Sequence, residues 1–163
     1  MTELCGRQSH IEDSDNLLRA ARHNADSLAW NHAEGRWILN NFGLRFDPDL
    51  STFSESHLMR DGSGTQGLVD SEPRRPIVYS APVEAIRNFK RAGHEYVVAH
   101  TPTSETTPHC AHVSVIPSGF QLTEQHALRN REAADFNLLR TDLALEFKLV
   151  SGDITLERPP NSE

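Results

Sequence analysis

The spacing of apolar residues predicts a long helix near the N-terminus. From Asp15 to Phe42, apolar side chains recur at intervals of three and four residues, which is the period of an amphipathic helix. Ser14 or Asp15 can cap its first turn, and Gly43 stands where a terminating glycine is favoured. Gly35 weakens the middle of the segment and can divide it into two helices.

The next thirty or so residues change character. Turn-forming sequences interrupt residues 44–76 at three places, which are Asp-Pro-Asp at 47–49, Asp-Gly-Ser-Gly at 61–64 and Pro-Arg-Arg-Pro at 73–76. One short helix is predicted around residues 54–59. The rest is predicted to be a long irregular loop, and loops of this length are typically lids, binding loops, linkers or disordered segments.

The best-ordered stretch lies between residues 77 and 116. A strand at 77–79 is followed by a helix at 82–92, for which Pro82 is a favourable first residue and Gly93 a stop. A second strand at 95–99 completes a β-α-β unit, whose connection is right-handed if its strands are parallel. A third strand is predicted at 112–116.

The C-terminal part is predicted to contain a helix and a hairpin. Residues 123–140 are mostly helix formers, while apolar and other residues alternate over 143–150, as in a half-buried strand that turns into 153–157. The whole pattern predicts one α+β domain over residues 1–163. Its mixed sheet has about five strands and is covered by about three helices, and 1–14 and 158–163 are flexible ends.

Composition places the chain among globular proteins. It has 163 residues, 37% of them hydrophobic, with a mean hydropathy of −0.54. No apolar run approaches the roughly 18 residues that a membrane-spanning helix needs, and residues 1–5 lack the features of a signal peptide. Cys5 and Cys110 are too few for a disulfide framework. These features predict a soluble cytoplasmic protein without membrane contact.

The charge balance argues against general nucleic-acid binding. Sixteen basic and 23 acidic residues give a net charge of −7, so general attraction to phosphates is not expected, although an acidic protein can still contain a local basic groove. Of the basic residues only Lys90 and Lys148 are lysine. Arginine makes bidentate contacts with phosphate and carboxylate that lysine does not. A GC-rich genome produces the same bias, and the sequence favours that explanation.

Histidine is the residue type that most requires an explanation. The chain has nine histidines, and His109 and His112 flank Cys110 in the segment 108–112. Imidazole and thiolate are zinc ligands. We therefore predict a zinc site formed by His109, His112 and either His32 or Cys110. Glu34, which follows His32 by two residues, is the predicted general acid/base that moves protons to and from a zinc-bound water.

The segment Asn31-His32-Ala33-Glu34 resembles the signature of zinc-dependent nucleoside and nucleic-acid deaminases, an H-x-E followed by P-C-x-x-C. Pro108-His109-Cys110-Ala111-His112 has the proline and the spacing of the second half, with histidine in place of cysteine. The resemblance implies a metal-dependent hydrolase, deaminase-like, that acts on a nucleobase or nucleotide. The match covers only these residues, and His10-Ile11-Glu12 has the same H-x-E spacing.

A second hypothesis makes the protein a binding module. A small acidic protein can cap a basic enzyme, as immunity proteins and antitoxins do, because opposite charges accelerate association. Eight acidic residues that could form such a face lie within the first 72 positions: Asp13, Asp15, Asp47, Asp49, Glu55, Asp61, Asp70 and Glu72. This hypothesis predicts a basic protein partner in place of a small-molecule or nucleotide substrate.

Overall fold

The structure is a computed structural model that describes residues 10–40, 43–45, 49–60, 62–91, 94–104, 106–118 and 141–159. Within these residues, seven strands form one sheet in the order β6-β7-β8-β4-β1-β5-β9. The strands are β1 (Asn16–Ala21), β4 (Leu50–Ser54), β5 (Ile77–Pro82), β6 (Lys90–Arg91), β7 (His94–His100), β8 (His112–Ser118) and β9 (Lys148–Ser151). A separate hairpin pairs β2 (Leu28–Asn31) with β3 (Arg36–Leu39).

The α+β class is confirmed, but the sheet is antiparallel and not mixed. Every pair of neighbouring strands in the described residues runs antiparallel. The helices are short: α1 (Glu55–Arg60), α2 (Gly64–Ser71), α3 (Val83–Arg87) and the 3₁₀ helix η2 (His109–Ala111). A further helical turn spans residues 141–144.

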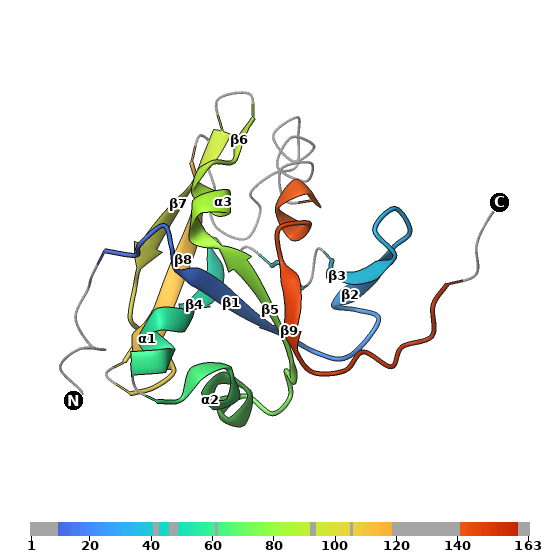
Figure 1. The fold of residues 1–163 in the computed structure, drawn as a ribbon, viewed down its shortest axis with the longest axis horizontal. Helices are drawn as coiled ribbons and strands as arrows, with labels where there is room; N and C mark the ends of the chain where they lie inside the picture. Colours follow the sequence, from blue (N-terminus) through green and yellow to red (C-terminus); the bar gives the residue numbers. More distant parts are fainter. Residues whose placement is uncertain are drawn as a thin grey trace.

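The helices lie on both sides of the sheet and give the protein two apolar cores. Figure 1 shows α1 and α2 on one side of β1 and β5, and α3 on the other. The larger core joins inward side chains of the sheet to Val83 and Ile86 of α3. The smaller core lies under α1 and α2, where Leu58 and Leu68 pack against Leu18.

The predicted N-terminal helix is wrong. Residues 16–21 form β1, a central strand between β4 and β5. Leu17 and Leu18 belong to different cores, so both faces of β1 are apolar and the usual alternation of a strand is lost. Leu28, Trp37 and Ile38 belong to the β2–β3 hairpin, where Gly35 has the positive φ of 63° that its turn requires, and Phe42 lies outside the described residues.

The predicted loop at 44–76 is also wrong for the residues described. This segment contains β4, α1 and α2, of which only the helix near 54–59 was predicted. Ser54 begins α1 because its Oγ accepts a hydrogen bond from the His57 amide at 3.2 Å, as an N-cap side chain does. Of the predicted turn formers, Gly62 and Ser63 lie between α1 and α2.

The strand-helix-strand prediction for residues 77–99 is confirmed as a sequence of elements. β5, α3 and β7 follow one another, although α3 ends at Arg87 and the short strand β6 precedes β7. β5 and β7 do not pair, because β1, β4 and β8 lie between them. The strand at 112–116 is confirmed as part of β8.

The C-terminal prediction is only partly correct. Residues 141–144 are helical and the strand β9 begins at Lys148, where it pairs with β5. Residues 153–159 are irregular, so the predicted hairpin does not form. The alternating apolar residues Leu143 and Phe147 are nonetheless buried in the larger core. The helix predicted at 123–140 lies outside the described residues.

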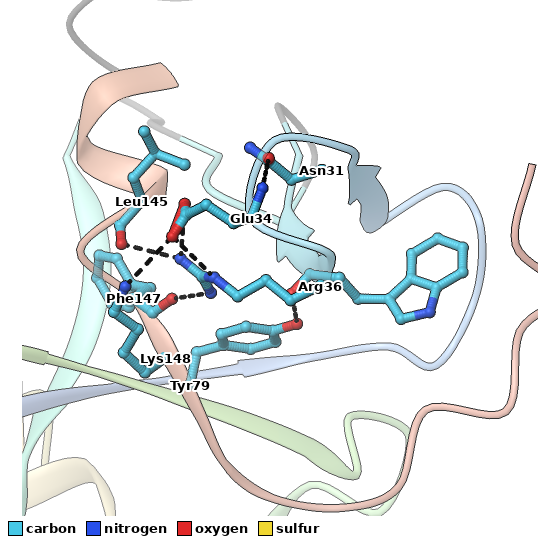
Figure 2. Close-up of polar contacts among 8 residues, drawn as sticks. Asn31, Glu34, Arg36, Tyr79, Leu145, Phe147 and Lys148 are labelled. Atoms are coloured by element: carbon cyan, nitrogen blue, oxygen red, sulfur yellow. Dashed lines mark hydrogen bonds and ion pairs between the residues drawn. The ribbon is translucent and has the colours of Figure 1, made fainter. Parts of the chain in front are cut away.

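Polar side chains attach the β2–β3 hairpin to the main sheet (Figure 2). The guanidinium of Arg36 donates hydrogen bonds to the carbonyl oxygens of Leu145 and Phe147, both at 2.9 Å. The Tyr79 hydroxyl donates to the Trp37 carbonyl at 2.7 Å, and burial raises the pKa of Tyr79 to about 12, so the phenol stays neutral. These bonds fix the hairpin beside β5 and the segment before β9.

Parts of both predicted flexible ends are packed. Ile11 is 2% exposed and belongs to the larger core, and the Arg158 guanidinium lies 4.5 Å above the Trp30 ring. Among the described residues no helix is long and apolar enough to cross a membrane.

Candidate functional site

The structure does not bring the predicted zinc ligands together. His32 and Glu34 lie in the turn of the β2–β3 hairpin, where the His32 ring stands edge-on to Trp30. His109 and Cys110 lie in η2, and His112 begins β8. Within the described residues, no three His, Cys, Asp or Glu side chains are grouped as metal ligands. The zinc hydrolase therefore stays a prediction from sequence.

Glu34 has an ion-pair role in this hairpin. Its carboxylate lies 3.3 Å from the Arg36 guanidinium and 3.6 Å from the Lys148 ammonium, as Figure 2 shows. The hydrogen bond from Arg36 lowers the pKa of Glu34, with a smaller contribution from Lys148. A general acid/base works best with a pKa near neutrality, so this environment favours a permanently charged carboxylate.

Cys110 is disulfide-bonded, so its sulfur is not a thiolate ligand. Its carbonyl oxygen is hydrogen-bonded to Nε2 of the buried His100 at 2.7 Å. His109 beside Cys110 is exposed.

The predicted acidic face is partly used for internal contacts. Asp15 is buried and hydrogen-bonded, and Asp13 forms an ion pair with Arg87 at 2.6 Å. Asp70 accepts a hydrogen bond from Gln66 on the same helix. Asp47 and Asp61 lie outside the described residues. The binding-module hypothesis is not tested by this placement.

Arginine, and not histidine, marks the most distinctive pocket in the described part of the chain. A pocket of about 440 Å³ lies at the end of β1, between the 24–27 loop, the segment 43–45 and the residues before β5. Ten residues line it, and four of them are arginines: Arg19, Arg22, Arg45 and Arg75. The same lining has one carboxylate, Asp26. The pocket is therefore strongly positive in a protein whose net charge is −7.

Arg19 is the fixed member of this set. Its Nε donates to the Gly43 carbonyl and its Nη1 to the Ser51 carbonyl, both at 2.8 Å. Burial, together with the positive charge of Arg75, lowers the pKa of Arg19 to about 10. The group is still charged at neutral pH.

The other arginines are more exposed. Arg22, Arg45 and Arg75 are all exposed, and the side chains of Arg22 and Arg75 make no ion pair or hydrogen bond within the described residues. A guanidinium with five donors and no protein acceptor is available to an anion from solution. The pocket therefore combines the anchored cation of Arg19 with the guanidinium groups of Arg22 and Arg75, which have no protein acceptor among the described residues.

A buried polar cluster lies at the other end of β1. His57 of α1 is 3% exposed, its Nδ1 lies 2.8 Å from the Ser54 hydroxyl, and its ring lies 4.7 Å from that of His100. Burial lowers the pKa of His57; the charges of His100 and Arg60 lower it further, while Asp15 opposes them.

This pKa shift predicts a loss of stability in mild acid. A histidine whose pKa is lowered in the folded state binds a proton more readily in the unfolded state. Its contribution to the free energy of unfolding is therefore fully present above the pKa of the unfolded state, about 6.5, and is lost as the pH falls below that value. We expect a smaller free energy of unfolding in urea at about pH 5.5 than at about pH 7.5. The His57→Asn variant, whose amide can still reach Ser54, should show a weaker pH dependence. An equal dependence in both proteins would contradict the assignment.

Comparison with known proteins yields no relative: no protein-family model, curated protein or solved structure matches this chain. The function must therefore be argued from the pocket. Its four arginines come from three separate regions of sequence, so no local motif could reveal it. The available signal was the excess of arginine over lysine.

Proposed function

We propose that the protein binds a small phosphate-bearing molecule in the arginine pocket. The observation that carries this proposal is the convergence of four arginines and one carboxylate on one pocket of an acidic protein. Clustered like charges are unfavourable without a counter-charge. The attraction of a bound dianion to these arginines would offset the repulsion among them.

Phosphate suits this set of side chains better than a single carboxylate does. Guanidinium groups bind phosphate oxygens through paired, charge-assisted hydrogen bonds, and several can share one phosphate. The volume of about 440 Å³ lies within the range of small-molecule sites. Arg19 would supply a fixed cation at the pocket wall, and Arg22 and Arg75 would close on the ligand from its rim.

Calorimetric titration with pyrophosphate at low ionic strength tests this proposal. We expect the wild-type protein to bind it, and the Arg22→Ala/Arg75→Ala double variant to bind at least about tenfold more weakly, because each charge-assisted bond contributes roughly 1.5–3 kcal/mol. Both side chains are exposed, so their removal should leave the fold intact.

Arg60→Ala is the matched control. Arg60 is an exposed arginine of α1 that does not line this pocket, and its loss changes the net charge in the same direction. We expect near wild-type affinity. If wild type does not bind pyrophosphate, or if Arg60→Ala weakens binding as much as the double variant, a specific arginine pocket is contradicted.

A further inference from the structure

We propose that Ser51 is an activated nucleophile, with His112 as its general base, and that the protein hydrolyses carboxylic esters through an acyl-serine intermediate. The Ser51 hydroxyl and Nε2 of His112 are hydrogen-bonded, and the Nδ1 of the same ring lies 2.9 Å from the Thr101 carbonyl oxygen. This inference goes beyond anion binding and does not depend on it.

The Thr101 carbonyl decides the tautomer of His112. A carbonyl oxygen can only accept, so Nδ1 must carry the proton that is donated to it. Nε2 then has a free lone pair, and the Ser51 hydroxyl must be the donor in their hydrogen bond. This is the protonation state in which an imidazole can take a proton from a serine.

The ring of His112 is also held from its sides. The Thr101 hydroxyl lies 3.0 Å from Nδ1 and 2.7 Å from the Ser114 hydroxyl, so it can accept from the ring and donate onward. The Phe53 ring stands edge-on to the imidazole with centroids 5.7 Å apart. A base held by a third group is the arrangement that nucleophilic catalysis requires.

The pairing of β4 with β8 creates this geometry from residues that are distant in sequence. Ser51 lies opposite Ser114, and Phe53 lies opposite His112. Positions 51 and 53, like 112 and 114, therefore project from the same face of the sheet, and the imidazole reaches diagonally to Ser51. Ser51 and His112 are both half-buried.

Arg19 adds a positive charge to the same residue. Its Nη1 donates to the Ser51 carbonyl at 2.8 Å. Arg19 therefore connects this pair to the wall of the arginine pocket.

The proposed reaction has two balanced steps. Ser51 Oγ attacks the ester carbonyl carbon while its proton passes to His112 Nε2; the tetrahedral intermediate then expels the alcohol, which takes that proton. In the second step His112 accepts a proton from water, the hydroxide oxygen attacks the acyl carbon, and Ser51 leaves with the proton from Nε2. The products are an alcohol and a carboxylic acid.

A fluorophosphonate probe tests the nucleophile without knowledge of the substrate. We expect stoichiometric labelling of wild type, with the adduct on the Ser51 peptide by mass spectrometry and fluoride as leaving group. Ser51→Ala and His112→Ala should lose both labelling and p-nitrophenyl acetate hydrolysis. Ser80→Ala, which changes another half-buried serine of the same sheet, should retain both. Labelling elsewhere, or persistence of either signal in Ser51→Ala, would overturn the proposal.

A second experiment measures an increase in reactivity, which distinguishes a catalytic role from a loss of activity caused by misfolding. In Ser51→Cys, the imidazole should activate the new thiol, so that iodoacetamide alkylates it at least about tenfold faster than the thiol of a Ser80→Cys protein with the same melting temperature. Equal rates for the two cysteines would also overturn the proposal. Loss of pyrophosphate binding would leave these results unaffected, so the two proposals fail separately.

Discussion

Replacing Asp15 with alanine should destabilise the protein by about 3–5 kcal/mol, the range found when one partner of a buried charged network is removed. The carboxylate of Asp15 is 7% exposed and accepts four hydrogen bonds. Its Oδ2 accepts from the Ser54 and Ser56 hydroxyls at 2.5 and 2.8 Å, and its Oδ1 from the Asn16 and Ser56 amides at 2.7 and 3.1 Å.

The physical reason is the position of these bonds between two elements. Asp15 stands just before β1, and its partners Ser54 and Ser56 stand at the junction of β4 and α1. Alanine would leave the buried Ser54 hydroxyl without its acceptor and would loosen the start of the helix that Ser54 caps. Urea unfolding monitored by circular dichroism would measure the loss.

Asp13→Ala is the matched comparison for this prediction. Asp13 is two residues away, and its ion pair with Arg87 is on the surface, where its side chain is 65% exposed. Surface pairs contribute roughly 0–1 kcal/mol, so this variant should stay close to wild type. If the two variants lose the same stability, the buried network is not what holds β1 and α1 together.

The elements that sequence predicted correctly are those with local signals of their own. α3 has Pro82 before it, an apolar face and charged ends that suit the helix dipole, and these signals do not depend on neighbours. β8 contains the β-branched residues Val113, Val115 and Ile116, which favour a strand locally. In each case the local preference and the tertiary environment agree.

The secondary-structure prediction for the N-terminal half was wrong because the spacing of apolar residues there reflects tertiary packing and not a local helical preference. β1 is covered on both sides, by α1 and α2 on one and by the larger core on the other, so apolar residues occupy both of its faces. A helical period and a doubly buried strand are then indistinguishable by spacing alone. The strand can be identified only when β4 and β5 are known to flank it.

The candidate sites depend on the pairing of strands distant in sequence even more than the secondary-structure elements do. Ser51 and His112 are 61 positions apart and meet through the register of two strands, whereas His109 and His112 are close in sequence but belong to no group of three possible metal ligands among the described residues. The density of histidine in the sequence gives no indication of this strand pairing. A hydrogen-bonded imidazole with a fixed tautomer specifies a chemical role, that of a base, whereas a cluster of histidines in one loop does not.

Gly43→Ala should lower both stability and anion binding, because Gly43 forms the wall that holds Arg19. A methyl group at this position would overlap with the Ser27 carbonyl oxygen and lie 3.0 Å from Cδ2 of Leu39. Because the Ser27 oxygen is a backbone atom, relieving the overlap requires a shift of the main chain, which is energetically costly. We expect a loss of about 2–4 kcal/mol in unfolding free energy. The displaced Gly43 carbonyl would also release the Nε of Arg19, so pyrophosphate affinity should fall at least about tenfold.

Gly35→Ala separates this packing effect from backbone strain. Gly35 has a φ of 63° but nothing lies within 4 Å of an added methyl group, so only the conformational cost of about 1 kcal/mol applies. Its turn in the β2–β3 hairpin does not line the arginine pocket, and pyrophosphate affinity should be unchanged. If Gly43→Ala binds pyrophosphate as tightly as Gly35→Ala does, the anchoring of Arg19 by Gly43 is not what positions the pocket.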